Sequence, residues 1–300
     1  MMGNPAISRG VFCTHPSVIR RLDVPVFTIP LSKILSMRLF LLLISLIAFS
    51  CSGSKPGGTH FGQTEWIDLT HAFDKNTLYW PNNVNGFELR TESEGMTPGG
   101  YFYSSYSLCA PEHGGTHLDA PVHFAAGKLT ADQLPLSSLT GEAIVVDVSG
   151  AAGKNRDYLL SVADLEAWEK KHGRIPDQSI VLVRTGYGRY YPDREKYFGT
   201  ARKGPQAIPE LHFPGIDPAA AQWLVDRRKV KAMGLDTPSL DYGQSGDFRT
   251  HRVLMGANCP GFENLANLDK LPAKGIYVVA LPMKIAGGSG GPLRIIATTK

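Results

Sequence analysis

The sequence predicts a mixed α/β fold, built as one compact domain over residues 65–300 that follows an N-terminal targeting region. Short apolar runs of strand length alternate with a few segments that have clear helix caps, a pattern typical of α/β or α+β proteins. The chain has 300 residues, of which 43% are hydrophobic and 19% are charged. This composition indicates a globular protein with enough apolar content for one sizeable core, although the length alone would also permit two domains.

Six segments are predicted to be β-strands. The runs over 143–148 and 179–183 are continuously apolar, which indicates strands that are buried on both faces. The segment over 101–109 is rich in aromatic residues, which favour strands. Together the six predicted strands span 66–70, 101–109, 143–148, 179–183, 231–235 and 276–281.

Two helices are predicted from their capping residues. The first covers 162–172, with Ser161 as N-cap, Asp164 in the first turn and Gly173 just beyond the end. The second opens with Asp217 as N-cap and Pro218 at the first helical position, where proline is well tolerated.

The segment from His113 to His123 carries the strongest chemical signal. It places three histidines and one aspartate within eleven residues, interrupted by a Gly-Gly pair and a proline. Imidazole nitrogens and carboxylate oxygens are the ligands that hold Zn, Mn or Fe(II) in proteins. His117 and Asp119 are two residues apart, so an extended backbone would point both side chains to one face. Because glycine and proline disfavour a helix here, we predict a turn that runs into a short strand.

This stretch resembles the H-G-G-T-H-x-D-x-P-x-H motif of the cyclase family, metal-dependent hydrolases that include bacterial kynurenine formamidase and isatin hydrolase. Segments 251–255 and 260–265 resemble the family's second ligand segment, in which a histidine is followed twelve residues later by a glutamate. Segment 78–81 resembles the one that supplies the aromatic wall of the substrate pocket. The resemblance covers 64–298 and implies a compact, swivelling β/β/α fold with the site at the strand ends.

The resemblance also implies a role for each site residue. The metal ligands would be His113, His117, Asp119, His251 and Glu263, while His123 would be the acid/base and Trp80 would contact the substrate. One catalytic zinc usually has three protein ligands, so five ligands suit two ions bridged by the two carboxylates. Zinc is the expected metal, manganese is the alternative, and a single-ion site stays open.

The activity implied is cleavage of a small aromatic amide by a water that the metal activates to hydroxide. Arylformamidase-like conversion of N-formylkynurenine to kynurenine and formate is the first expectation. With an unperturbed pKa of about 6.5, His123 could take a proton from the water and pass it to the leaving nitrogen. Hydrolysis of isatin, or of another cyclic amide or ester, is the same chemistry on a different substrate. A different class, a non-catalytic metal- or ligand-binding lipoprotein, is disfavoured because all six expected side chains are present.

Other features narrow the possible partners. The net charge of +4, without a long Lys/Arg run, argues against nucleic acid, and the four cysteines contain no C-x-x-C pair. The glycine-rich segment 287–292 lacks the Lys-Ser/Thr of a phosphate loop and predicts a turn near the pocket. Asp236 and Asp241 either orient metal-bound histidines or only form a turn. We expect a homodimer or a higher homo-oligomer.

The first 64 residues are expected to lie outside the fold. Arg38 and a short apolar run predict a signal peptide over 37–51, too short to span a bilayer comfortably. Cys51 resembles the lipid-modified cysteine of a bacterial lipoprotein. We therefore expect an exported protein, membrane-anchored through lipid on Cys51, or otherwise periplasmic or secreted. An unprocessed N-terminus would instead place it in the cytoplasm. Residues 1–36 are interpreted as a non-native or unstructured extension and 52–64 as a linker.

Overall fold

The computed structural model describes residues 65–83 and 85–299. The predicted extension, signal peptide, Cys51 and linker lie outside these residues. The described residues belong to one compact unit. Among them, no helix combines the length and the apolar character needed to cross a membrane.

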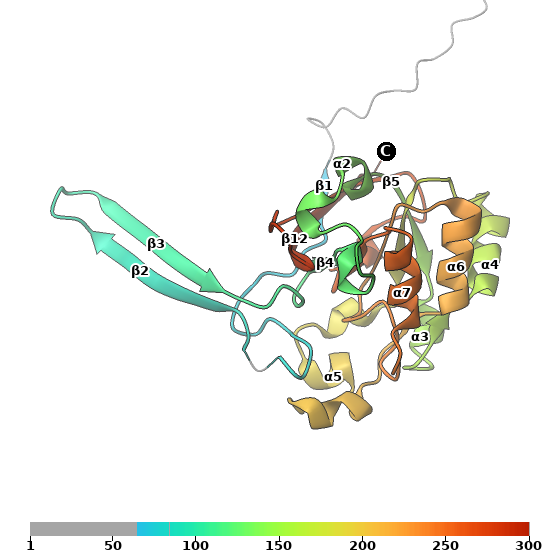
Figure 1. Ribbon diagram of the computed structural model, residues 1–300, viewed down its shortest axis with the longest axis horizontal. Coiled ribbons are helices and arrows are strands. Elements are labelled where there is room, and N and C mark those ends of the chain that lie inside the picture. Colours follow the sequence, from blue (N-terminus) through green and yellow to red (C-terminus); the bar gives the residue numbers. More distant parts are fainter. Residues whose placement is uncertain (1–64, 84, 300) are drawn as a thin grey trace, which may run out of the picture. The chain divides into compact units, whose positions relative to one another are not determined.

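Eight strands form a sheet that closes on itself (Figure 1). Their order is β1-β12-β11-β5-β7-β9-β10-β4, and β12 also pairs with β4, which completes the closure and leaves β1 at an outer edge. Strands β5, β7, β9 and β10 run parallel, while the remaining pairs are antiparallel. The bounds are β1 Trp66–Asp68, β4 His117–Asp119, β5 Thr140–Asp147, β7 Ile180–Arg184, β9 Ala232–Leu235, β10 Gly261–Glu263, β11 Ile276–Pro282 and β12 Gly290–Thr299.

The sheet separates two hydrophobic cores, which explains the continuous apolar runs in β5 and β7. In β5, Val145 points into the core enclosed by the sheet, whereas Ile144 and Val146 point to the core under the helices. In β7, Leu182 and Val181 alternate in the same way. Successive side chains of a strand face opposite sides, so burial on both sides requires a continuous apolar run. The prediction of fully buried strands is confirmed.

Helices cover the outer core, and Figure 1 shows α4 and α6 side by side on that face. The predicted helix 162–172 is confirmed as α4, where Ser161 and Asp164 form the reciprocal capping pair. The helix predicted after Asp217 is also confirmed. The helix bounds are α2 Leu136–Leu139, α3 Ser149–Ala152, α4 Val162–His172, α5 Arg194–Phe198, α6 Pro218–Arg228 and α7 Arg249–Gly256.

Smaller elements complete the domain. Strands β6 (Leu159–Leu160) and β8 (Gly215–Ile216) form a two-stranded parallel sheet. Short 3₁₀ helices cover Pro121–His123, Ala131–Gln133, Tyr187–Tyr190, Pro205–Glu210 and Leu268–Lys270.

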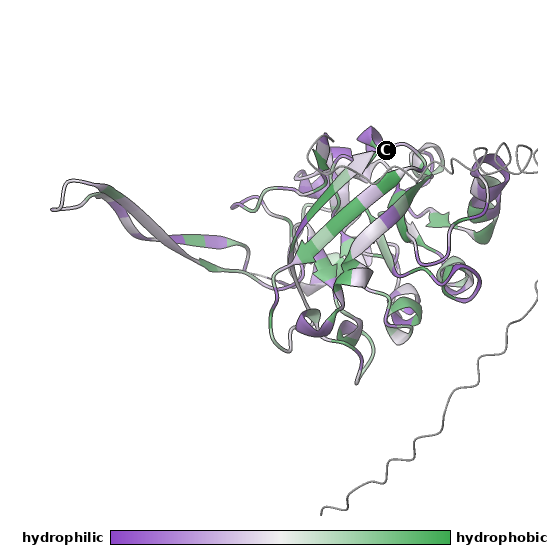
Figure 2. Ribbon diagram, turned by 90° about the horizontal axis from the view of Figure 1, so that it is seen from above, coloured by the Kyte–Doolittle hydropathy of each residue, from purple (hydrophilic) through white to green (hydrophobic). Residues whose placement is uncertain are grey.

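An antiparallel hairpin of β2 (Glu88–Met96) and β3 (Phe102–Cys109) projects from the domain (Figures 1 and 2). We call residues 88–109 the arm. Strand β3 confirms the strand predicted over 101–109. The sequence analysis does not predict β2, because its residues are mostly charged or polar, nor β12, because Gly290 and Gly291 indicate a turn. The other five predicted strands are present, with ends that shift by no more than three residues.

Candidate metal centre and pocket

A tight turn places the motif against the neighbouring segment of the chain. Gly115 has a left-handed φ of 56°, and its N–H donates to the Leu78 carbonyl at 2.9 Å. A side chain at Gly114 would overlap the ring of Tyr79, and one at Gly115 would meet the Phe73 ring at 2.7 Å. Only glycine therefore permits this close approach. The chain then enters β4, as predicted.

Strand β4 lies between β10 and β12, and this pairing gathers residues that are distant in sequence. His117 is directly opposite Glu263 of β10. Helix α7 contributes His251, whose Nε2 lies 3.2 Å from Oδ2 of Asp119. His117, Asp119, His251 and Glu263 are all less than 5% exposed. Four of the five predicted ligands thus form one buried cluster.

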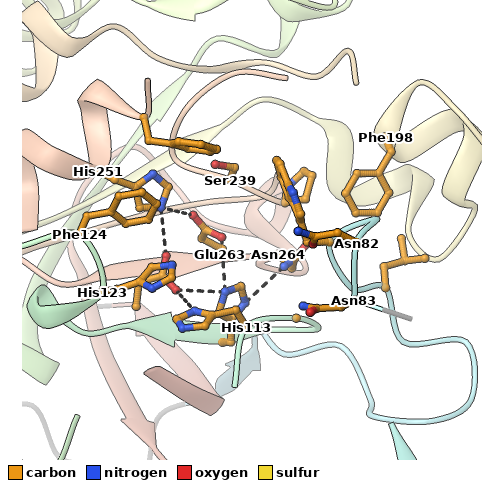
Figure 3. A pocket seen from close by; sticks show the side chains of 17 residues that line it. Asn82, Asn83, His113, His123, Phe124, Phe198, Ser239, His251, Glu263 and Asn264 are labelled. Carbon is orange, nitrogen blue, oxygen red and sulfur yellow. Dashed lines mark hydrogen bonds and ion pairs between the residues drawn. The ribbon is translucent and has the colours of Figure 1, made fainter. Parts of the chain in front are cut away.

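The carboxylates of Asp119 and Glu263 lie between histidine nitrogens on two sides of the cluster (Figure 3). Asp119 Oδ1 lies 3.2 Å from His117 Nε2, while its Oδ2 faces His251. Glu263 Oε2 lies 3.4 Å from His117 Nε2, while its Oε1 lies 3.1 Å from His251 Nε2. His113 joins the first group, with its Nδ1 2.6 Å from Asp119 Oδ1. The ligand atoms form two sets that share Asp119, namely His113–His117–Asp119 and Asp119–His251–Glu263.

Hydrogen bonds to the outer ring nitrogens orient two of the histidines. Asp241 Oδ2 lies 2.6 Å from His251 Nδ1, and the Gly115 carbonyl lies 3.0 Å from His117 Nδ1. Each bond leaves Nε2 directed at the carboxylates, which is how metal-ligating histidines are usually held. Asp241 therefore orients the His251 ring and does more than form a turn. Asp236 does not, because it accepts instead from the N–H of Thr185 and its neighbours.

A further chain of contacts orients His113. Its Nε2 lies 2.9 Å from Ser289 Oγ, and this hydroxyl donates to Glu112 Oε2 at 2.6 Å. The Ser289 N–H donates to the same carboxylate oxygen. Ser289 belongs to the glycine-rich segment 287–292, which passes the site as predicted. Sequence analysis does not identify Glu112 or Ser289, because only the fold brings them together.

Replacing Ser289 with alanine is expected to weaken metal binding by roughly 10- to 100-fold, the usual effect of losing a partner of a ligating histidine. The alanine removes the hydroxyl that fixes the His113 ring. Competition with a chromophoric chelator would measure the change. Ser137→Ala is the matched control, since this serine is exposed on α2 and should leave affinity unchanged. Equal affinities for both variants would contradict the positioning role.

Electrostatics show that the cluster attracts positive charge. Burial disfavours protonation of His117, yet the Asp119 and Glu263 carboxylates outweigh it and raise the His117 pKa to about 9. For His251, burial again opposes protonation, but hydrogen bonds to Asp119, Asp241 and Glu263 raise its pKa well above the usual value. Burial and the neighbouring Asp119 charge raise the pKa of Glu263. Convergent imidazole and carboxylate atoms with oriented rings fit a divalent transition-metal ion.

His123 borders this cluster without joining either ligand set. Its ring stacks on that of His113 with centroids 3.8 Å apart, and its centroid lies 6.2 Å from that of His251. Burial, with the charges of nearby histidines, lowers the His123 pKa to about 4. The ring lines the cavity beside the ligands, where an acid/base group must lie.

An aromatic cavity of about 260 Å³ opens onto the cluster (Figure 3). Trp80 lines it as predicted, and contacts Phe198 and Phe248 edge-on, each with ring centroids 6.4 Å apart. Phe124, Phe198 and Phe248 are lining residues that the sequence analysis does not identify. The aromatic residues 101–103 belong to the arm and do not line this cavity. Among the described residues, no lysine or arginine lines it, and Asn82 and Asn83 supply polar groups instead.

Comparisons with known proteins show which sequences and folds this chain is similar to. A family model described as "Putative cyclase" matches residues 67–242. Isatin hydrolase of Roseibium aggregatum is 34% identical over 250 residues, covering 79% of this chain and 92% of that protein. Kynurenine formamidase of Salinibacter ruber is 30% identical over 234 residues, covering 77% and 95%. A solved isatin hydrolase bound to the product analogue thioisatinate has a TM-score of 0.72 at 31% identity, covering 91% of this chain and 100% of that one.

Proposed function

Because the chain belongs to the cyclase family, we propose that it hydrolyses the C–N bond of a small, uncharged aromatic amide at a metal centre. The predicted family membership is confirmed, and with it the expectation of a metal-dependent hydrolase that acts on C–N bonds other than peptide bonds. The observation that carries the proposal is the aromatic cavity that ends on a cluster of three histidines and two carboxylates, of which all but the partly buried His113 are buried.

The proposed metal ligands are His113, His117, Asp119, His251 and Glu263. Two ions are supported by the way in which each carboxylate directs one oxygen to His117 and the other to His251. Zinc is the metal we propose, because imidazole and carboxylate donors suit it, and manganese is the alternative. When bound, the metal would polarise the amide carbonyl and lower the pKa of the attacking water.

The surrounding side chains perform the remaining steps. Trp80 and Phe248 hold the aryl group and exclude water from the cavity. His123 Nδ1 or Nε2 takes the proton from the attacking water and returns it to the nitrogen that leaves. Asp241 and the Gly115 carbonyl keep the His251 and His117 rings in one orientation throughout. No serine or cysteine nucleophile is required.

The charge of the cavity favours uncharged substrates. N-formylkynurenine is an arylformamide with an additional α-ammonium and α-carboxylate group, whereas isatin and formanilide are neutral. A buried carboxylate needs a paired charge or several hydrogen bonds. No described lysine or arginine lines the cavity, and its uncharged hydrogen-bonding side chains are those of Asn82, Asn83, Ser239 and Asn264. N-formylkynurenine and isatin both contain a suitable C–N bond. Because only N-formylkynurenine carries charged groups, the uncharged lining favours the isatin-like alternative.

Rates on three substrates test the proposal. The protein is stripped with a chelator, reloaded with Zn or Mn, and assayed with isatin, formanilide and N-formylkynurenine. We expect no activity after stripping, restoration by metal, and a kcat/KM for N-formylkynurenine no higher than that for formanilide. Activity that survives stripping would refute the metal dependence. A strong preference for N-formylkynurenine would refute the choice of uncharged substrates.

Export remains a proposal that rests on residues outside the described range. The signal-like segment 37–51 supports processing at Cys51, which would leave the enzyme tethered to a membrane by lipid. Mass spectrometry of the N-terminus from the native host should find a lipidated Cys51. A free N-terminus just after the apolar run would mean secretion, and an intact Met1 or Met37 would contradict processing.

A further inference from the structure

Asn264 supplies a side-chain amide at the end of the cavity that holds the candidate metal ligands. It follows Glu263 directly in the chain and lines the cavity, yet it is only 2% exposed. Its Nδ2 atom lies 3.5 Å from Nδ1 of His117, whose Nε2 atom faces the two carboxylates. Figure 3 shows the Asn264 side chain beside the histidines of the cluster. One imidazole ring therefore separates this amide from the candidate metal ligands.

The backbone at Asn264 is held in a left-handed conformation by two neighbouring segments. Its φ is 54°, in a region that asparagine tolerates better than most residues do. The Asn264 N–H donates to the Thr237 carbonyl at 2.9 Å, and the Asn264 carbonyl accepts from the Thr116 hydroxyl at 2.7 Å. The peptide groups on both sides of the residue are therefore fixed in place.

Two further partners fix the orientation of the side-chain amide. The Gly115 carbonyl can only accept, so the atom that lies 2.7 Å from it must be the Nδ2 donor. The Oδ1 atom then accepts from the Tyr197 hydroxyl at 2.9 Å. This hydroxyl also lies 3.2 Å from the Asp236 carbonyl, but the Asn264 oxygen is nearer. Tyr197 is fully buried, so water does not compete for the bond.

One N–H of the amide has no acceptor within the described residues. A side-chain NH₂ group carries two hydrogens, and the Gly115 carbonyl takes one of them. His117 Nδ1 cannot take the other, because it donates its own proton to the same carbonyl. No further acceptor from residues 65–83 or 85–299 contacts Nδ2. A buried donor without a partner is costly, so the molecule that occupies the cavity is what can satisfy it.

The other uncharged polar side chains of the cavity are less suited to hold a ligand atom. Asn82 and Asn83 are exposed, so water competes for their amides. Ser239 is buried, but among the described residues only its backbone carbonyl is hydrogen-bonded, so the direction of its hydroxyl is not fixed. Donors that are already in position stabilise a developing charge best, because they need not reorient during the reaction. Of these four side chains, Asn264 combines burial with a fixed direction.

We propose that the remaining N–H of Asn264 donates to the carbonyl oxygen of the substrate, an inference that rests on the proposed amide hydrolysis. When the attacking water oxygen bonds to the carbonyl carbon, the electron pair of the C=O π bond moves onto the carbonyl oxygen. A hydrogen bond to a charged oxygen is about twice as strong as one to a neutral oxygen. The donor therefore stabilises the transition state more than the bound substrate. Tyr197 is a positioning residue, because it holds the other end of the amide.

Turnover by the metal-loaded full chain is the first test. Asn264→Gly removes the amide without straining the left-handed backbone, and it should lower kcat for isatin or formanilide on the order of a hundredfold, with a smaller change in KM. Asn267→Gly is the matched control, because Asn267 has a similar φ of 56° and its amide donates to the Asp68 carbonyl, outside the cavity. The control should keep kcat within a few fold, and both variants should retain metal by elemental analysis. An unchanged kcat in Asn264→Gly, or loss of its metal, would overturn the proposal.

Binding of two ligands tests the hydrogen bond without turnover. The ketone 1-indanone has a carbonyl group but no C–N bond to cleave, and indane has the same bicyclic frame without the carbonyl. In calorimetric titrations, Asn264→Gly should weaken 1-indanone binding about 3- to 10-fold, the range expected for one neutral hydrogen bond, and leave indane binding unchanged. Tyr197→Phe should change the same ratio in the same direction but by less.

The two measurements separate this inference from the proposed function. Equal 1-indanone affinity in the wild type and in Asn264→Gly would overturn the inference. An equal loss of affinity for indane would also overturn it, because the variant would then have altered the shape of the cavity rather than one hydrogen bond. A wild type that hydrolyses no amide but loses only 1-indanone affinity on Asn264→Gly would support the carbonyl contact and contradict the proposed function.

Discussion

Replacing Asp119 with alanine is expected to cause the largest loss of function in the chain. Asp119 is 1% exposed and is shared by both sets of candidate ligand atoms. Without it, both positions lose an oxygen, and His113, His117 and His251 lose their common partner. Metal content should fall below about half an ion per chain, because neither set of candidate ligands retains three protein ligands. The metal contributes several kcal/mol to the transition state, so kcat/KM should fall on the order of a thousandfold or more.

Elemental analysis and kcat/KM measure these two effects, and Asp236→Ala provides the matched control. Asp236 is equally buried, at 4% exposed, but it accepts from the Thr185 and Gly186 N–H groups rather than facing the cluster. Its replacement should lower thermal stability while the folded protein retains metal. An Asp119→Ala protein that keeps a full complement of ions would contradict the proposed ligand set.

Local features of the fold could be predicted because their causes are local. The capping pair of Ser161 and Asp164 lies within one turn and fixes the start of α4. The continuous apolar runs of β5 and β7 are predictable because both faces of these strands are buried. The arm shows the opposite case, because the polar residues of β2 become a strand only through pairing with β3. The start of β12 is a further example. Its glycines alone indicate a turn, and they belong to a strand because they pair with β4.

The residues of the site also fall into two groups, those that the sequence alone predicts and those that only the fold brings together. The motif itself predicts that His117 and Asp119 share a face, because both belong to one short strand. Glu263 and His251 could be named only through the resemblance, since long-range pairing and helix packing bring them to the cluster. Ser289 has no signal of its own in the sequence, because a serine among glycines is typical of any turn. The contacts of Ser289 and Glu112 with His113 therefore emerge only from the fold, whereas Asp241 could be named from the sequence as one of two candidates for such a role.

His123→Asn is expected to separate proton transfer from metal binding. The ring of His123 stacks on His113 but belongs to neither ligand set, so the variant should retain its ions. A positioned acid/base group contributes about 10²- to 10⁴-fold, so kcat should fall by that factor. Elemental analysis and steady-state kinetics check both expectations. His71→Asn is the matched control, because burial lowers its pKa to about 4 as it does for His123, yet its ring stacks on Tyr191 instead. This control should keep kcat within a few fold. If His123→Asn loses its metal, His123 is a ligand and the proton must be carried by another group.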